Sequence, residues 1–340
     1  MRLERVDAAA DTERVRACHA MYLAGAPADY PAVPPMSERA FAGWLERGWS
    51  EDHPQAWLAA DGAGEPAGWY LLGLPEWENT HLASISLLVA PARRRAGLGT
   101  ALVRHAAGQA ADSGRRILAA DARQGSAAEA FFRAIGATPG IAEVDRVLRL
   151  GSIPAGRRAA LRAQAEAAAR GYLLLSWDGP APEAHVDALA ALAEAINDAP
   201  RGAGREGQRW DAQRVREDEQ RMAGQGLRYY AVAAAGQRGE LAAVTQLAVD
   251  PARPEWGFQE LTAVARPHRG HRLGLLVKLA MLDLLAAREP QLTTILTGNA
   301  DANKHMIAIN EQLGFTEADR WLSWDLEVAR ALALPQRDRL

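Results

Sequence analysis

The sequence predicts a mixed α/β protein built from two copies of one domain, and three observations support this. The chain has 340 residues, which is enough for about two domains of ordinary size. Strand-like and helix-like patterns follow each other in the same order in both halves. Two short motifs recur at nearly one spacing: Val89 and Val264, each followed five residues later by an Arg, are 175 residues apart, and Gly136 and Gly314 are 178 residues apart.

The elements of the first half follow from local patterns of apolar and turn-forming residues. The predicted strands are 2–7, 57–60, 67–74, 82–89, 116–120 and 144–150. The predicted helices are 11–23, one that starts near 37, 97–112 and 126–135. Ser37 is a good N-cap, and Phe41 and Trp44 follow it at helical spacing. A Pro-rich connection that includes Pro27 separates the first two helices, and Asp61 begins a turn between two strands.

The second half repeats this order after an Ala- and Arg-rich segment, which reads as a solvated linker helix. Its predicted strands are 172–177, 229–233, 241–249, 258–264, 293–297 and 321–326. Its predicted helices are 184–197, 211–222, 273–287 and 303–313. The expected organisation is therefore a first domain over 1–150, a linker over 151–171, a second domain over 172–328 and a tail over 329–340.

Composition excludes several classes of protein. The formal net charge is -3, with 39 basic and 42 acidic residues, so no positive excess is available for a nucleic-acid backbone. The single cysteine, Cys18, rules out an intrachain disulfide. The sequence shows neither a signal-peptide pattern nor an apolar run long enough for a membrane span. We therefore expect a cytoplasmic protein without membrane or nucleic-acid partners, and the excess of Arg over Lys is typical of a GC-rich bacterial genome.

One segment of each half combines a strand end, glycines and a helix start. In the first half, Val89 is followed by Arg94, Arg95, Gly97, Leu98 and Gly99. In the second half, Val264 is followed by Arg269, Gly270, His271, Arg272, Leu273 and Gly274. Glycines let the backbone approach a ligand closely, and free amides at a helix start favour anions. The pattern suits a pyrophosphate, although a turn with a solvated Arg run is the alternative.

Together with the x-Gly-x step after the last helix of each half, these loops resemble those of the GNAT superfamily of N-acetyltransferases. In that family an Arg-x-x-Gly-x-Gly loop holds the pyrophosphate of acetyl-CoA, and Arg94, Gly97 and Gly99 match it. In the second half Arg272 replaces the middle glycine, while Gly270 still relieves the turn. The resemblance implies two tandem acetyltransferase-like domains, each with a mostly antiparallel twisted sheet flanked by helices.

The resemblance also implies where the chemistry lies. Many family members keep a general base on the strand before the loop, and strand alternation would place Phe258, Glu260, Thr262 and Val264 on one face. At the matching place the first half has Ile85. The resemblance implies that Asn303 helps to hold the acetyl-CoA arm, and it places the usual catalytic Tyr at Asn310. Asn303 and Asn310 are therefore catalytic candidates, and Asn299 is a cofactor-binding candidate that could equally be a turn residue. Without gaps, the counterparts of Asn299, Asn303 and Asn310 in the first half are Asp121, Gly125 and Phe132.

These contrasts predict that the second domain catalyses and that the first is a degenerate copy that supports the fold or still binds acetyl-CoA. Glu260 could instead be a surface carboxylate, and Asn303 could be only a helix cap. Asp198, Trp256 and Phe258 are candidates for binding the acceptor, with a helix-ending role as the alternative for Asp198. Tyr229 and Tyr230 are substitutes for the missing Tyr.

The predicted activity is metal-free transfer of an acetyl group from acetyl-CoA to a primary amine of a small molecule, by a monomer or homodimer. A non-catalytic acyl-CoA-binding or regulatory protein is the main alternative. Transfer of a longer acyl group, or transfer to a protein amine, also fits the sequence.

Overall fold

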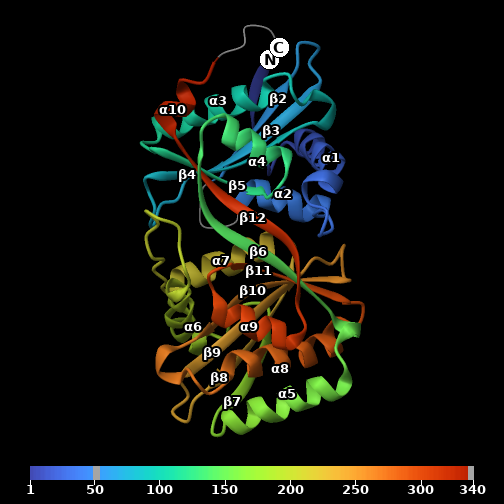
Figure 1. Cartoon of the computed structure of the whole chain (residues 1–340), viewed down its shortest axis with the longest axis vertical. Helices are drawn as coiled ribbons and strands as arrows, with labels where there is room; N and C mark the ends of the chain where they lie inside the picture. The colour runs from blue at the N-terminus through green and yellow to red at the C-terminus, as the bar shows by residue number, and fades with distance from the viewer. Residues whose placement is uncertain (49–53, 336–340) are drawn as a thin grey trace. The chain divides into compact units, whose positions relative to one another are not determined.

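The chain forms two compact units in a computed structural model that describes residues 1–48 and 54–335 (Figure 1). Unit 1 comprises 1–142, 202–206 and the segment from 320 to the C-terminus. Unit 2 comprises 143–201 and 207–319. In the part of the chain that is described, no helix combines the length and the apolar character needed to cross a membrane.

The sheet of unit 1 is mostly antiparallel, as expected. Its strand order is β1-β2-β3-β4-β5-β12. Only β4 and β5, among the strands of this sheet, run parallel to each other. The strands are β1 (Arg2–Val6), β2 (Gln55–Ala60), β3 (Pro66–Gly73), β4 (Leu82–Val89), β5 (Ile117–Arg123) and β12 (Thr316–Glu327).

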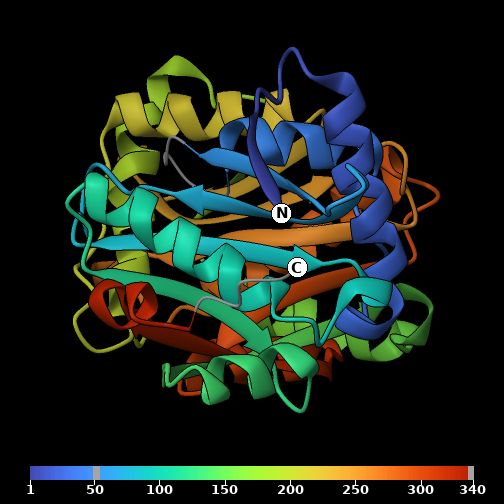
Figure 2. The same ribbon diagram turned by 90° about the horizontal axis from the view of Figure 1, so that it is seen from above.

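Helices cover both faces of this sheet. One face packs on α1 and α2 through a core that contains Cys18 and Phe41. The other packs on α3, α4 and α10 through a core that contains Leu102 and Phe132, and Figure 2 shows α3 (teal) lying across the strands on this face. The helices are α1 (Thr12–Asp29), α2 (Glu38–Arg47), α3 (Leu98–Asp112), α4 (Ala127–Ala134) and α10 (Val328–Leu332), and a 3-10 turn, η1, spans Pro91–Arg93.

Two helix boundaries in unit 1 have clear physical causes. Ser37 caps α2 as predicted, since its hydroxyl accepts a hydrogen bond from the Ala40 amide. The first helix is longer than predicted, because α1 continues through Pro27 to Asp29. A proline this close to the end of a helix removes a backbone hydrogen bond only from the last turns, so it does not break the helix where the sequence pattern suggested.

The sheet of unit 2 has the strand order β6-β11-β10-β9-β8-β7. It is also mostly antiparallel, with β10 and β11 as the parallel pair. The strands are β6 (Thr138–Arg149), β7 (Leu173–Asp178), β8 (Arg228–Ala235), β9 (Leu241–Val249), β10 (Trp256–Val264) and β11 (Thr294–Ala300). The central strand β9 is buried along its whole length.

The helices of unit 2 also lie on both faces (Figure 1). Residues of α6 and α7 pack on one face of the sheet, whereas residues of α5, α8 and α9 pack on the other. The helices are α5 (Ala155–Ala168), α6 (Val186–Ala193), α7 (Ala212–Gly224), α8 (Leu273–Arg288) and α9 (Lys304–Leu313). Short 3-10 turns occur at η2 (Leu150–Ser152), η3 (Glu183–His185), η4 (Glu194–Asp198) and η5 (Arg266–His268).

The two repeats have exchanged their last strands. β6, which ends the first repeat, pairs antiparallel with β11 in unit 2 from Arg149–Thr294 to Glu143–Ala300. β12, which ends the second repeat, pairs antiparallel with β5 in unit 1 from Trp321–Arg123 to Glu327–Ile117. The compact units therefore differ from the sequence repeats, because each sheet is completed by a strand from the other half of the chain.

The segment 151–171 is more than a solvated linker. It forms α5, and one side of this segment is buried in the core with residues of α8. The buried residues on this side are Leu161, Ala165 and Ala169. Arg162 on the same helix forms an ion pair with Asp283 of α8. Small Ala side chains allow two helices to approach closely, so a helix without many large apolar residues can still pack.

The segment after residue 328 also packs. Val328 and Ala331 of α10 are buried in the core of unit 1, so this part is a helix rather than only a tail. Residues 336–340 of the predicted tail lie outside the described residues.

Candidate functional site

In both units the parallel strand pair separates toward its carboxyl ends. β4 and β5 pair from Leu82–Ile117 to Ser84–Ala119, and the ladder ends there. β10 and β11 pair from Trp256–Thr294 to Phe258–Leu296. Beyond these points the strands continue without pairing to each other, so backbone N–H and C=O groups face the gap. Such an edge can hydrogen-bond an extended chain that carries amides.

The loops at the open ends of these gaps have the same backbone conformation. Positive φ angles occur at Arg95 (66°) and Gly97 (93°) in unit 1, and at Gly270 (86°) and Arg272 (53°) in unit 2. Each loop therefore has one glycine and one arginine at its two left-handed positions, in opposite order. The replacement of the middle glycine by Arg272 leaves the path of the loop unchanged, at the strain cost of a non-glycine residue in that region.

Both loops lead into helices whose first amides are free of side-chain caps. α3 begins after Gly97 and α8 after Arg272, and neither residue caps its helix through a side chain. By contrast, Asp211 caps α7 and Asn303 caps α9. Uncapped N–H groups at a helix start attract anions. The residues present therefore fit a pyrophosphate at either loop.

The side chains of Arg94 and Arg269 fold back onto their own loops. The Nε atom of Arg94 donates to the Val89 carbonyl at 3.1 Å, and its Nη2 atom pairs with Asp29 at 2.6 Å. Arg269 donates to the Val264 carbonyl at 3.3 Å and pairs with Asp198. The two arginines thus stabilise the turns in the same way, whereas the sequence predicted that they bind phosphate directly.

Other predicted loop residues have identifiable contacts. Arg272 and His271 point toward α5, where they contact the Gln164 side chain and the Ala168 carbonyl. A Cβ atom on Gly99 would lie 3.4 Å from the Phe131 ring, and one on Gly274 would lie 3.2 Å from Ile309. These glycines therefore permit close packing of α3 on α4 and of α8 on α9. Leu98 and Leu273 are buried core residues.

A β-bulge on β10 distinguishes unit 2 from unit 1. Gln259 pairs with Leu247 and Thr262 pairs with Thr245, so the two residues between them on β10 face a single residue of β9. The corresponding pairing of β3 with β4 is regular from Gly68–Val89 to Gly73–Ser84. Bulges interrupt the ladder and redirect side chains, and they are frequent beside active sites. The residues in the bulge are Glu260 and Leu261.

The bulge corrects the predicted arrangement of side chains on β10. Gln259, Thr262 and Val264 lie on the α8 face. Phe258, Leu261 and Ala263 lie on the face of α6 and α7. Thr262 and Val264 therefore do not share a face with Phe258, because the extra residue inverts the alternation.

The bulge also corrects the match between the repeats. Ile85 pairs with Leu72 of β3, and Gln259 pairs with Leu247 at the equivalent place on β9. Ile85 is thus the counterpart of Gln259, while Glu260 and Leu261 together take the place of Ser86. Ser86, like Ile85, is neither an acid nor a base, so unit 1 still has no counterpart of the Glu260 carboxyl group.

Glu260 lies in an environment that suits proton transfer. The residue is exposed, and nearby protein atoms partly desolvate its carboxyl group. This desolvation raises its pKa to about 7, with Arg221 lowering the pKa and Asp218 raising it. Asp218 and Arg221 lie on α7 and pair with each other at 2.5 Å. A carboxylate that titrates near neutral pH is well matched to general-base catalysis.

Tyr229 and Tyr230 lie on opposite faces of β8. Tyr229 packs with Met222 of α7 and interacts electrostatically with Glu260, and burial raises its pKa well above 10. The Tyr230 hydroxyl instead donates to Glu289 at 2.5 Å. Of the two substitutes that the sequence suggested for the missing acid, only Tyr229 therefore faces the side of the sheet that carries Glu260.

The three asparagines of unit 2 occupy different places. Asn299 lies on the part of β11 beyond its pairing with β10, and its side chain accepts a hydrogen bond from Asn310 at 2.8 Å. Asn310 is fully buried, so it holds Asn299 and does not present an accessible group for catalysis. Asn303 caps α9 through the Met306 amide. Ser126 caps α4 in the same way, and Phe132 is buried in the core of unit 1.

The predicted acceptor residues are not gathered at one point. Asp198 pairs with both Arg266 and Arg269, and these hydrogen bonds lower its pKa far below the usual range. This arrangement favours a role in holding the loop. Phe258 lies on the Glu260 face, about 7 Å along the strand from Glu260, whereas Trp256 lies about 13 Å away at the other end of β10.

Sequence reasoning missed Asp218 and Arg221 as neighbours of Glu260. Their spacing of three residues places them on one side of α7, which a helical pattern could have shown. Their proximity to β10 is a tertiary contact that the pattern does not contain.

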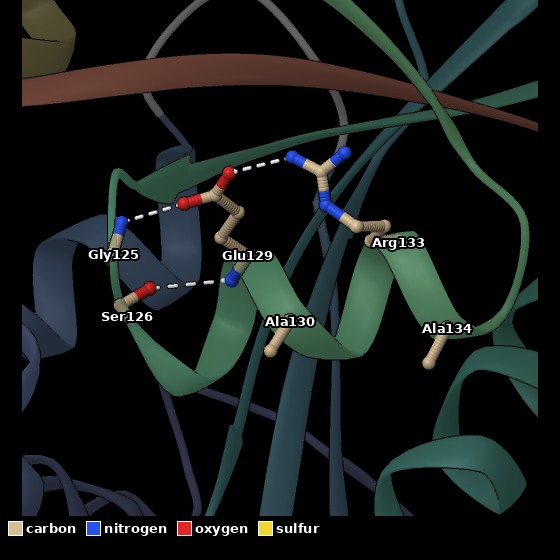
Figure 3. Close-up of a pocket in the computed structure, with 6 residues that line it drawn as sticks. All are labelled: Gly125, Ser126, Glu129, Ala130, Arg133 and Ala134. Carbon is tan, nitrogen blue, oxygen red and sulfur yellow. Dashed lines mark hydrogen bonds and ion pairs between the residues drawn. The ribbon is translucent and has the colours of Figure 1, made fainter.

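A surface hollow of about 440 Å³ lies beside α4 in unit 1 (Figure 3). At its edge the Ser126 hydroxyl accepts from the Glu129 amide, and the Glu129 carboxylate accepts from the Gly125 amide and pairs with Arg133 at 2.9 Å. No predicted site residue lines the hollow; its lining residues are Gly125, Ser126, Glu129, Ala130, Arg133 and Ala134.

Comparison with known proteins agrees with this architecture. A model of the acetyltransferase (GNAT) family matches residues 16–137. A tandem GNAT protein from the clavulanic acid biosynthesis pathway is 28% identical, over 96% of this chain and 98% of its own, with a TM-score of 0.80. A GCN5-related N-acetyltransferase from Sphaerobacter thermophilus is 16% identical over 96% of this chain and 95% of its own, with a TM-score of 0.66, which supports the fold alone. No curated protein sequence matches the chain. Residues 16–137 therefore match the GNAT acetyltransferase family, and the chain shares the two-unit fold of a tandem GNAT protein.

Proposed function

We propose that the protein is an acetyl-CoA-dependent N-acetyltransferase that acetylates a primary amine of a small molecule, and that unit 2 carries out the chemistry. The observation that supports this most strongly is the position of Glu260. It lies in the β10 bulge, beside the gap between β10 and β11, and its pKa is raised to about 7. Unit 1 has a regular strand with Ser86 at this place.

Features of this site fit three parts of acetyl-CoA, which supports the proposal. The uncapped start of α8 and the loop before it suit the pyrophosphate. The unpaired edges of β10 and β11 suit the amides of the extended arm, which would bring the thioester toward the bulge. In the bulge, backbone groups that do not pair with β9 are available to the thioester carbonyl oxygen.

Glu260 would supply the base for the transfer. In its ionised form it takes a proton from the acceptor amine, whose nitrogen then bonds to the thioester carbonyl carbon. The C–S bond breaks, the sulfur leaves with the electron pair, and the remaining extra proton of the nitrogen passes to the departing thiolate or to water. A thiol has a pKa of roughly 8–9, so the leaving sulfur needs little help from an acid. Tyr229 is the hydroxyl on the correct face of the sheet if one is used.

The test is release of free thiol when the protein, acetyl-CoA and a panel of primary amines are mixed. Wild-type protein should release thiol with at least one amine, and Glu260→Gln should lower the rate roughly 10²–10⁴-fold. Glu217→Gln, a change at a partly exposed position of α7 in unit 2, is the control and should keep the wild-type rate. Full activity in Glu260→Gln would contradict the assignment.

A non-catalytic acyl-CoA-binding protein is the second candidate, because neither α4 nor α9 presents an accessible hydroxyl where the usual Tyr is expected: Phe132 and Asn310 are both buried. Binding of acetyl-CoA without thiol release across a broad panel of small and peptide amines would favour this candidate. Comparing acetyl-CoA with longer acyl-CoA thioesters in the same assay would determine the acyl preference.

A further inference from the structure

A buried polar network lies directly behind the bulge, on the face of β10 opposite to Glu260. Lys278 of α8 is only 3% exposed, and its Nζ atom donates to the Gln259 side-chain oxygen at 3.3 Å. The Gln259 amide nitrogen donates to the Thr245 hydroxyl at 3.0 Å and to the Gln246 carbonyl. The Thr245 hydroxyl also bonds to the Thr262 hydroxyl at 2.9 Å.

This network holds both ends of the bulge. Gln259 immediately precedes Glu260, and Thr262 immediately follows Leu261. Both side chains hydrogen-bond to the same Thr245 hydroxyl on β9. The strand segments before and after the bulge are therefore fixed to one atom of the neighbouring strand, and Lys278 fixes the remaining polar end of Gln259.

Unit 1 shows what occupies these positions when no bulge is present. The first residues of α3 and α8 are 175 residues apart, so Val103 of α3 corresponds to Lys278 of α8. Ile85 corresponds to Gln259, and both Val103 and Ile85 are buried in the core of unit 1. The apolar pair accompanies a regular strand, and the polar pair accompanies the bulged strand that carries Glu260.

The cost of burying a lysine makes a purely space-filling role an inadequate explanation. Burial lowers the pKa of Lys278 to about 7, which reflects the unfavourable transfer of its charge from water. An apolar residue such as Val103 fills the equivalent space without this cost. Both the charged and the neutral amine can donate to the Gln259 oxygen, so the contact persists in either form.

We propose that Lys278 and Gln259 are positioning residues, which hold the β10 bulge in the conformation that directs the Glu260 carboxyl group toward the open end of the site. This inference rests on the proposed function of Glu260 as general base. Lys278 does not touch the substrates; it acts through Gln259 and the backbone of the bulge.

The test is the double variant Lys278→Val with Gln259→Ile, which gives unit 2 the apolar pair of unit 1. Replacing buried polar pairs by apolar residues is often neutral or stabilising, so the variant should fold with an unchanged or higher melting temperature. We expect kcat to fall about 10²-fold with little change in the KM for acetyl-CoA. The Glu260 carboxyl, followed by carbon-13 NMR and assigned with Glu260→Gln, should titrate at lower pH, because a carboxyl group released from its fixed position is better hydrated.

Two further variants keep the test decisive. Leu279→Met changes a buried neighbour on α8 at nearly constant volume, and it should leave both kcat and the Glu260 titration unchanged. Lys278→Met removes only the amine, and it should lower kcat in the same direction if the double variant fails to fold.

The outcomes separate this inference from the proposed function. Absence of thiol release by wild-type protein with every amine would refute the proposed function, whereas the NMR titration would still report on positioning. An unchanged kcat together with an unchanged Glu260 titration in the folded double variant would overturn the inference. A fall in kcat without any change in that titration would assign the network a merely structural role and would also overturn it.

Discussion

The dependence of acetyl transfer on pH follows directly from the environment of Glu260. With a pKa of about 7, the ionised fraction of this carboxyl group is about 0.1 at pH 6, 0.5 at pH 7 and 0.9 at pH 8. If Glu260 is the base, kcat/KM should therefore rise about tenfold between pH 6 and pH 8. A carboxyl group at the ordinary value of 4.5 would be almost fully ionised over this range, so it would give almost no change.

The assay is thiol release at limiting amine and saturating acetyl-CoA, in wild-type protein and in Glu260→Gln. The variant separates the titration of the enzyme from that of the acceptor, because both proteins share the acceptor. The wild-type profile should contain an ascending limb near pH 7 that the variant lacks. Profiles that superimpose after scaling would assign the limb to the acceptor amine and would refute the reasoning.

Stability provides an independent measure of the same pKa. The pKa of Glu260 is raised on folding, so the folded state favours the protonated carboxyl group. Its favourable contribution is complete below about pH 4.5 and is lost as the pH rises through about 7. Denaturant titrations should therefore show wild-type protein losing stability relative to Glu260→Gln between these pH values. A constant difference would mean that the carboxyl group titrates normally in the folded protein.

Two further predictions concern the loops. Arg272→Gly should keep the loop conformation and remove left-handed strain, whereas Gly97→Arg should introduce such strain. Each change should shift the free energy of unfolding by roughly 1–2 kcal/mol, which chemical denaturation would measure. Shifts of the same sign in the two variants would contradict this. Asp198→Asn should weaken acetyl-CoA binding by releasing Arg266 and Arg269, seen as a higher KM for acetyl-CoA. A higher KM for the amine alone would instead support the alternative role of Asp198 in acceptor binding.

The sequence predicted the repeated elements and the two loops well because these depend on local signals. Glycines at positive φ, apolar periodicity and helix starts are encoded within a few residues, as at Gly97 and Gly270. The bulge was not predictable in this way. The segment around Glu260 reads equally well as a regular strand, and only the pairing with β9 shows that one residue is extra.

The exchange of the last strands was invisible for a related reason. β6 and β12 end their repeats with similar alternation, and nothing in that alternation specifies which sheet each one joins. The buried side of α5 was missed because Ala165 and Ala169 provide little apolar signal, although the structure buries both of them. Long-range partners decided these features, and local composition did not.

The exchanged strands have a consequence for how the protein folds and how it can be divided. Neither half of the chain contains all the strands of its own sheet, so an isolated first half would lack the partner of β5 and an isolated second half would lack the partner of β11. The pairing of β5 with β12 joins residues about 200 positions apart, and contacts of such separation form slowly. A single cut between the repeats would leave each sheet with one strand that comes from the other fragment. Deletion of either half would therefore remove a strand from the sheet that the other half contributes most to.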